Sequence, residues 1–134
     1  MSPSEAVAVV LNFENKINDH DVDGVVASFS SDGRFVDSLG NIIGIDKMQA
    51  AWTAYFRMVP DYRISHEEVF ANDSAIALFG KAEGTYTTDG KLNKENLWSS
   101  PASWLAKVDG GKIKEWRVYC DNEPIREIMR KQKR

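Results

Sequence analysis

Disulfides, leader segments and membrane spans are the first features that the sequence lacks. It has one cysteine, Cys120, among 134 residues, which excludes an internal disulfide and hence a disulfide-rich secreted domain. The opening stretch MSPSEAVAVVLNFENKIND has no basic segment before an apolar run and soon includes charged residues. We therefore expect neither a signal peptide nor a membrane span, and a cytoplasmic protein is the default expectation.

An excess of charge of one sign is also missing. The formal net charge is −3, and no basic stripe is interleaved with aromatic residues. The dense basic run RKQKR, which starts at Arg130, is interpreted as a frayed, solvated terminus. Nucleic-acid contact by this run is the alternative interpretation, and we do not expect nucleic acid as a partner.

Motifs for phosphate, metal or activated-serine chemistry are absent. The sequence contains neither a glycine-rich phosphate loop nor a G-x-S-x-G turn. His66 could be a base or a metal ligand, but Glu67 and Glu68 beside it do not provide a recognised ligand spacing, which favours a solvated or hydrogen-bonded histidine. His20 lies in a polar connection and is expected to be exposed. We expect no metal and no cofactor.

The residues that are present suit one domain with a core of its own. Apolar spacing predicts amphipathic helices, the first capped by Ser2 and ending near Asn18, the third ending before Pro60. The expected helices cover residues 2–18, 21–29 and 44–59, with a last one starting at Pro124. The expected strands cover residues 34–39, 61–71, 74–88, 96–108 and 112–120, the last two joined by a hairpin turn at Asp109-Gly110-Gly111.

This order of elements, with helices first and strands later, predicts an α+β fold. The later strands should pair mostly as antiparallel neighbours, in a curved sheet wrapped around the N-terminal helices. Such a cone-shaped roll can enclose a pocket. Small residues at Gly80, Ala82 and Gly84, and alternating aromatic and polar residues from Asn96 to Trp104, are consistent with one, although tryptophans more often belong to the core.

Asp37 is the candidate for chemistry. It lies at the end of the strand RFVDSL, on the same side as Phe35, because strand side chains alternate between faces. A buried carboxylate is costly unless it is paired, so Asp37 is either a satisfied structural group or a working one. On an apolar face, desolvation is expected to raise its pKa and to make it a candidate general acid or base.

Three stretches carry a family resemblance: NFENKINDHDVDGVVASFSSDGRFVDSLGNIIGIDKMQAAWTAYF, PDYRISHEEVFANDSAIALFG and GGKIKEWRVYCDNEPIREI. Together they resemble the SnoaL-like branch of the nuclear-transport-factor-2-like superfamily, which includes ketosteroid isomerases and limonene epoxide hydrolases. The resemblance implies a single domain over residues 1–134 and a homodimer formed through the open sheet face. It specifies fold better than function, because this scaffold hosts enzymes, binding modules and adaptors.

Compared residue by residue, this sequence keeps the general base of the isomerases but not the two groups that act with it. The isomerases place their general base in a D-x-x-G turn, which matches Asp37 to Gly40, but the positions of their two oxyanion donors hold Phe13 and Trp104. The epoxide hydrolases need an aspartate where this chain has Val118. SnoaL-type cyclases use a single acid/base aspartate in an apolar pocket, and Asp37 is compatible with that role.

We therefore expect a protein that binds a small hydrophobic molecule and that is an acid/base enzyme of isomerase, cyclase or dehydratase type if it is catalytic. The alternatives are a non-catalytic ligand-binding protein and a dimeric interaction module. Asp37 is the expected catalytic residue. The expected substrate-binding residues are Phe13, Trp52, Tyr55, Tyr86, Asn96, Trp98, Trp104 and Trp116.

Overall fold

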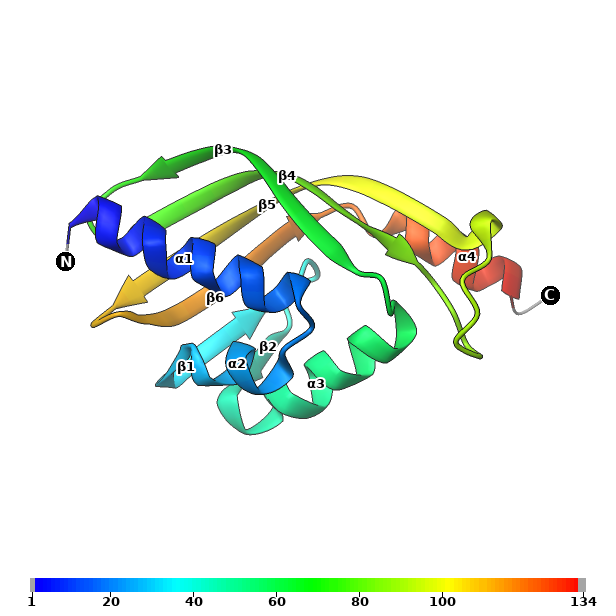
Figure 1. Ribbon diagram of the computed structural model, residues 1–134, viewed down its shortest axis with the longest axis horizontal. Coiled ribbons are helices and arrows are strands. Elements are labelled where there is room, and N and C mark those ends of the chain that lie inside the picture. Colours follow the sequence, from blue (N-terminus) through cyan, green and yellow to red (C-terminus); the bar gives the residue numbers. More distant parts are fainter. Residues whose placement is uncertain (1, 133–134) are drawn as a thin grey trace.

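The computed structural model describes residues 2–132, which form helices packed on one face of a six-stranded sheet (Figure 1). The helices are α1 (Pro3–Asn18), α2 (Val22–Ala27), α3 (Ile45–Met58) and α4 (Glu123–Gln132), with a single 3-10 turn at Lys94–Asn96. The strands are β1 (Phe29–Val36), β2 (Ile42–Gly44), β3 (Arg63–Ala71), β4 (Ala75–Thr85), β5 (Leu97–Asp109) and β6 (Lys112–Cys120). Their order across the sheet is β2-β1-β6-β5-β4-β3.

This arrangement confirms the predicted α+β roll. Helix α1 begins where the sequence signals it, because the Ser2 side chain accepts a hydrogen bond from the Glu5 backbone N–H at 3.3 Å. Helix α3 ends at Met58, before Pro60, and β5 and β6 form the predicted antiparallel hairpin. No helix of residues 2–132 is both long and apolar enough to cross a bilayer.

The start of the sheet differs from the prediction. Phe29 begins β1 rather than ending the second helix, which stops at Ala27. The Ile113 N–H donates to Ser28 O at 2.8 Å, so sheet pairing starts at this point. Strand β1 pairs in parallel with β6, and the short strand β2, which was not predicted, pairs antiparallel with β1. The polar run from Ser30 to Gly33 lacks the alternation that marks a strand.

The core lies between α1 and the concave face of the sheet. Phe13 is fully buried there, with ring centroids 5.3 Å from Phe29 and 4.8 Å from Trp116. Trp116 and Trp104 stack with centroids 6.3 Å apart. These large side chains fill the sheet's concave face under α1, so any open space must lie elsewhere on that face.

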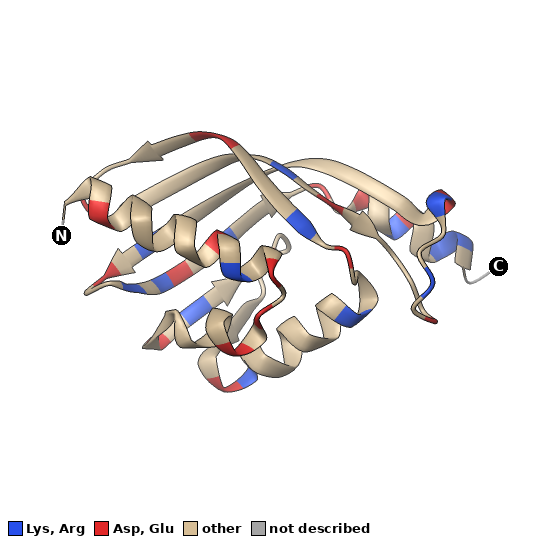
Figure 2. Cartoon of the chain, in the orientation of Figure 1, with Lys and Arg blue, Asp and Glu red and all other residues tan. Residues whose placement is uncertain are grey.

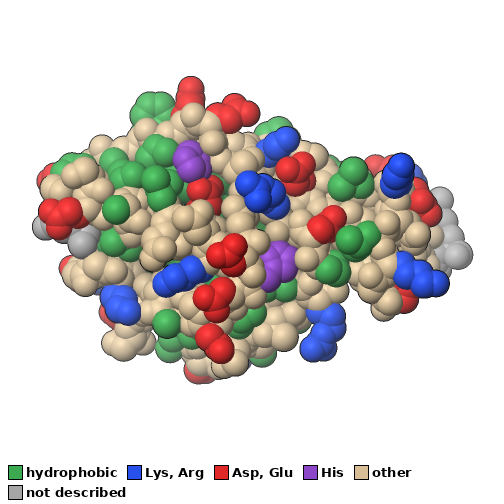
Figure 3. All heavy atoms as spheres, viewed as in Figure 1, with side chains coloured by type: hydrophobic (Ala, Val, Ile, Leu, Met, Phe, Trp, Pro, Cys, Tyr) green, Lys and Arg blue, Asp and Glu red, His purple; other side chains and the backbone are tan. Residues whose placement is uncertain are grey.

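Charges of both signs are dispersed over the elements. Figure 2 shows acidic and basic residues on helices and strands alike, and Figure 3 shows them interspersed on the face viewed. In the basic run RKQKR, Arg130 to Gln132 form the end of α4, and Lys133 and Arg134 lie outside the described residues.

Candidate functional site

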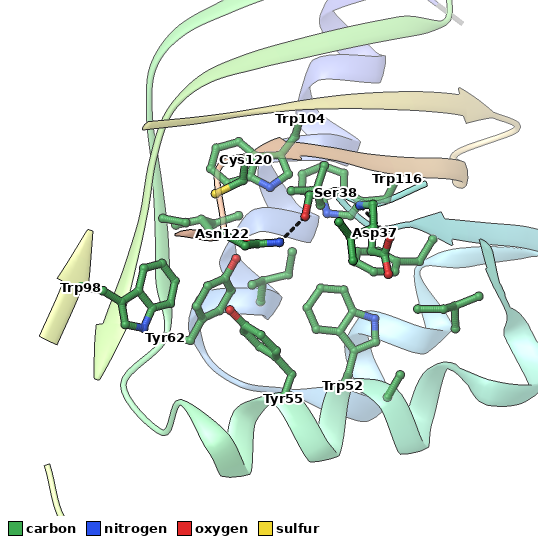
Figure 4. A pocket seen from close by; sticks show the side chains of 18 residues that line it. Asp37, Ser38, Trp52, Tyr55, Tyr62, Trp98, Trp104, Trp116, Cys120 and Asn122 are labelled. Carbon is green, nitrogen blue, oxygen red and sulfur yellow. Dashed lines mark hydrogen bonds between the residues drawn. The ribbon is translucent and has the colours of Figure 1, made fainter. Parts of the chain in front are cut away.

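A cavity of about 280 Å³ lies between α3 and the concave face of the sheet (Figure 4). Its aromatic lining residues are Phe35, Trp52, Tyr55, Tyr62, Trp98, Trp104 and Trp116. Its aliphatic lining residues are Ile17, Leu39, Ile43, Ala51, Ile64, Ala82 and Val118, and the others are Asp37, Ser38, Cys120 and Asn122. Leu39 lines the cavity and is also 64% exposed, so the cavity reaches the surface beside the β1–β2 turn.

The periodicity of each element explains which residues line the cavity. On β6, Trp116, Val118 and Cys120 share a face because successive strand side chains alternate. On α3, Trp52 and Tyr55 are three residues apart and so point to the same side of the helix. The cavity is therefore assembled from residues that are far apart in the sequence but lie on the same face of their own elements.

Asp37 lies at the mouth of the cavity, in the turn between β1 and β2. It lines the cavity together with Phe35, as strand alternation predicted, and it is half-buried. Its carboxylate accepts hydrogen bonds from the Leu39 N–H at 3.0 Å, the Asn41 N–H at 2.9 Å and Asn41 Nδ2 at 3.1 Å. The same carboxylate thus shapes the turn and forms part of the cavity wall.

Two tyrosine hydroxyls face the interior of the cavity. Tyr55 and Tyr62 contact each other edge to face, with centroids 4.9 Å apart, and Figure 4 shows their hydroxyls on the side of Asn122. Burial raises the pKa of both phenols, and the nearby Cys120 adds to the effect in each case. Both hydroxyls therefore stay protonated at neutral pH, and neither forms a hydrogen bond to the described residues.

Other polar groups complete the wall. Trp98 is 7% exposed, and its buried Nε1 finds no hydrogen-bond acceptor within residues 2–132. Burial raises the pKa of the Cys120 thiol. Asn122 Nδ2 donates to Ser38 Oγ, which ties the β1–β2 turn to the segment before α4 (Figure 4).

The structure brings most of the sequence-predicted site residues together. Asp37 and five of the expected substrate-binding residues line the one cavity: Trp52, Tyr55, Trp98, Trp104 and Trp116. Phe13 lies in the core behind Trp116, and Tyr86 and Asn96 lie outside the lining, joined by a hydrogen bond from the Tyr86 N–H to Asn96 O at 3.1 Å.

Sequence reasoning missed Tyr62, Cys120 and Asn122 as lining residues. Cys120 was detectable, because it shares strand parity with Trp116. Tyr62 was also detectable, because it lies in the expected strand 61–71 and shares parity with Ile64, which lines the cavity too. Asn122 lies beyond the end of β6, where periodicity gives no direction. Among the small residues of β4, Ala82 lines the cavity, whereas Gly84 permits close packing: a Cβ there would lie 2.3 Å from Val59 Cγ1.

The histidines lie outside the cavity. His66 Nδ1 lies 2.8 Å from an oxygen of the buried Glu14, in agreement with the hydrogen-bonded role expected for it. His20 is half-buried rather than exposed, stacks on Phe56 and contacts Tyr62 O through Nε2 at 2.7 Å. Within residues 2–132, no three His, Cys, Asp or Glu side chains are grouped as metal ligands would be.

The helices packed on a curved sheet, with an aromatic cavity between them, define the class of nuclear-transport-factor-2-like proteins. Within that class, the chain belongs to the SnoaL-like domain family, whose profile matches residues 10–116. No curated protein matches the chain in sequence.

Solved structures support the fold at low sequence identity. AclR, a proposed hydroxylase from Streptomyces galilaeus, superposes with a TM-score of 0.80 at 18% identity over 97% of this chain and 83% of its own. A proposed SnoaL-like polyketide cyclase from Shewanella putrefaciens CN-32 gives 0.79 at 14% identity over 95% and 86%.

A third solved structure is a hypothetical protein with a ketosteroid isomerase-like fold from Catenulispora acidiphila DSM 44928, in complex with trimethylamine. It superposes with a TM-score of 0.71 at 13% identity over 83% of each chain. At these identities, the likeness of all three structures establishes the fold and not the activity.

Proposed function

We propose that this chain is a cytoplasmic protein that binds a small, largely hydrophobic molecule in the aromatic cavity and transfers a proton to or from it through Asp37. The observation that carries the proposal is the composition of the lining: an acidic side chain and two tyrosine hydroxyls line the same largely apolar cavity of about 280 Å³. The reaction type that suits it is isomerisation, cyclisation or dehydration.

The chemistry needs only groups of this chain. The Asp37 carboxylate takes a proton from a carbon next to a ligand carbonyl, and the hydroxyl of Tyr55 or Tyr62 donates a hydrogen bond to the oxygen on which negative charge develops. If the ligand also has a C=C bond one carbon further along, return of the proton from Asp37 to the far end of that bond moves the double bond into conjugation with the carbonyl and completes an isomerisation. The donor role requires only that each phenol keep its O–H at neutral pH, and burial, which raises the pKa of both, favours the protonated form. A positioned general base contributes about 10²–10⁴-fold.

The structural neighbours add indirect support. Several are proposed polyketide cyclases, and one of the same fold was solved with trimethylamine, a small molecule. Each of these statements concerns the neighbour, and together they favour small-molecule chemistry in a scaffold of this kind.

The second candidate is non-catalytic ligand binding. It is favoured by the three N–H donors that already occupy the Asp37 carboxylate within its own turn. If the protein only binds a ligand, the cavity and its hydroxyl groups select that ligand, and Asp37 holds the β1–β2 turn in its conformation at the mouth of the cavity.

Proton exchange on a model ketone separates the two candidates. 2-Tetralone is incubated with the protein in D₂O, and deuterium incorporation next to the carbonyl is followed by NMR, while its binding is followed by tryptophan fluorescence. If Asp37 is the base, Asp37→Asn lowers the exchange rate by about 10²–10⁴-fold and leaves binding within a few-fold. Binding without any protein-dependent exchange would reject the catalytic version and keep the binding version.

Asp32→Asn is the matched control for this experiment. Asp32 is an exposed aspartate on β1 outside the cavity, and its removal changes the net charge by the same amount. It should retain the full exchange rate. Asparagine at position 37 keeps an oxygen for the Leu39 and Asn41 N–H groups, so a thermal melt of Asp37→Asn should show a folded protein.

Homodimerisation through the open sheet face is part of the proposal. Phe79 of β4 and Tyr119 of β6 are 45% and 52% exposed on the face away from the helices. Both residues pair with Ser103 of the intervening strand β5, so they lie in one row across the sheet. Phe70 extends this apolar surface by packing edge to face on Phe79. The molecular mass measured by sedimentation should be that of a dimer in the wild type and of a monomer in Phe79→Glu. Leu92→Glu, which changes an exposed loop residue, is the control and should remain a dimer. A monomeric wild-type protein would contradict it.

A further inference from the structure

The charge inside the cavity is of one sign. Among its 18 lining residues, Asp37 is the only aspartate or glutamate, and there is no lysine, arginine or histidine. A ligand carboxylate or phosphate would therefore lose its hydration without gaining a cationic partner, and it would meet the Asp37 charge as well. The cavity discriminates against anions.

The aromatic walls add to the same electrostatic bias. Seven rings line the cavity, and several are in contact: Phe35 with Trp52 at 5.1 Å between centroids, Tyr55 with Tyr62 at 4.9 Å, and Tyr62 with Trp98 at 6.3 Å. The face of an aromatic ring carries negative electrostatic potential and attracts a cation placed over it, most strongly for tryptophan and when water is excluded. All four tryptophans of the chain line this cavity.

The negative group is held in a fixed position. The hydrogen bonds from Leu39 and Asn41 immobilise the Asp37 carboxylate at the mouth, and Figure 4 shows it on the same side of the cavity as Trp52. Phe35, which points to the same side of the strand as Asp37, contacts the Trp52 ring with centroids 5.1 Å apart. An entering cation therefore meets a preorganised carboxylate at the mouth of an aromatic wall, at little further cost in side-chain entropy.

We propose that the natural ligand is a cation: an amine or quaternary ammonium group on a compact apolar skeleton that fits about 280 Å³. Its positive group lies between Asp37 and Trp52, and its apolar part lies against the remaining rings. This inference rests on the ligand-binding part of the proposed function, since it specifies the class of small molecule that the same cavity takes and assigns the Asp37 carboxylate to the charge of that molecule.

Three phenols of one shape test the inference. Each carries a tetrahedral group of similar size opposite the hydroxyl: positive in 4-trimethylammoniophenol, neutral in 4-tert-butylphenol and negative in 4-hydroxybenzenesulfonate. The first two differ only in the central atom of that group, which is nitrogen in the cation and carbon in the neutral compound. Each is titrated into the full chain at slightly acidic pH, where its phenolic hydroxyl stays protonated, and binding is followed by tryptophan fluorescence. We expect the cation to bind about tenfold more tightly than its carbon isostere. The sulfonate should not bind.

Two variants assign the preference to Asp37. Asp37→Asn should reduce the ratio of the affinities for the cation and for 4-tert-butylphenol several-fold, and Asp32→Asn should leave this ratio unchanged. The affinities of the two isosteres for the wild-type protein test the preference for a cation even if the Asp37→Asn variant fails to fold.

The outcomes separate this inference from the proposed function. If 4-tert-butylphenol binds as tightly as the cation, or the sulfonate binds best, the cationic ligand class is wrong and the binding function stands. If none of the three phenols and no neutral ketone binds, both fail. A preference for the cation that persists fully in Asp37→Asn, with the variant folded, would overturn the placement of the charge beside Asp37.

Discussion

Filling the cavity with a larger side chain should stabilise the protein and weaken ligand binding. Ala82 is 3% exposed and lines the cavity from β4, so Ala82→Leu adds three buried carbons to open space. At about 0.8 kcal/mol per buried CH₂, these carbons contribute about 2.4 kcal/mol. The loss of leucine rotamer freedom removes about 0.5–1 kcal/mol, which leaves a gain of about 1.5 kcal/mol in the free energy of unfolding.

Ala106→Leu is the matched control for this change. Ala106 lies on the neighbouring strand β5, is fully buried and does not line the cavity. Overpacking there should cost about 1–3 kcal/mol. Urea denaturation of the two variants should therefore give shifts of opposite sign, and only Ala82→Leu should weaken binding of 4-tert-butylphenol. If Ala82→Leu loses as much stability as Ala106→Leu, the space beside Ala82 is not available to a ligand.

Two further predictions concern charges outside the cavity. His66→Ala should lower the free energy of unfolding, measured by urea denaturation, by about 3 kcal/mol, because it removes the hydrogen-bonded partner of the buried Glu14. Adding Glu14→Met should cancel most of that loss. A loss of less than about 0.5 kcal/mol in His66→Ala would contradict the pairing with Glu14. For Glu115, burial opposes ionisation but is outweighed by the Arg34 hydrogen bond and three nearby cations, so its pKa is lowered from 4.5. The stability of the wild type relative to Glu115→Gln should therefore be full above about pH 5 and decline as pH falls below 4.5, whereas a pH-independent difference would refute the ion-pair account.

The predictable parts of the fold are those specified by local chemistry. The Ser2 cap, the stop of α3 before Pro60 and the hairpin at Gly110 and Gly111 each depend on a few adjacent residues. Gly110 and Gly111 have φ of 57° and 80°, which glycine adopts without strain. Strand alternation likewise placed Asp37 on the side of Phe35, and both line the cavity.

The unpredictable parts depend on contacts between distant segments. The parallel pairing of β1 with β6 joins residues about eighty positions apart, and no local pattern in the polar start of β1 specifies it. Asn122 reaches the cavity from the connection between β6 and α4, where periodicity is lost. The donors to Asp37 come from a turn closed by Asn41, whose role depends on the fold of β2. Side-chain partners of this kind become visible only when the backbone is placed.

Fluorine NMR of protein labelled with 3-fluorotyrosine shows directly whether the ligand binds in the cavity, because the four tyrosines lie in different parts of the molecule. Tyr55 and Tyr62 line the cavity, Tyr86 lies outside its lining, and Tyr119 lies on the opposite face of the sheet. On addition of 4-trimethylammoniophenol, we expect shifts of the Tyr55 and Tyr62 resonances and an unchanged Tyr119 resonance. A shift of Tyr119 alone, or no shift at any tyrosine with this phenol or its neutral isostere, would contradict it.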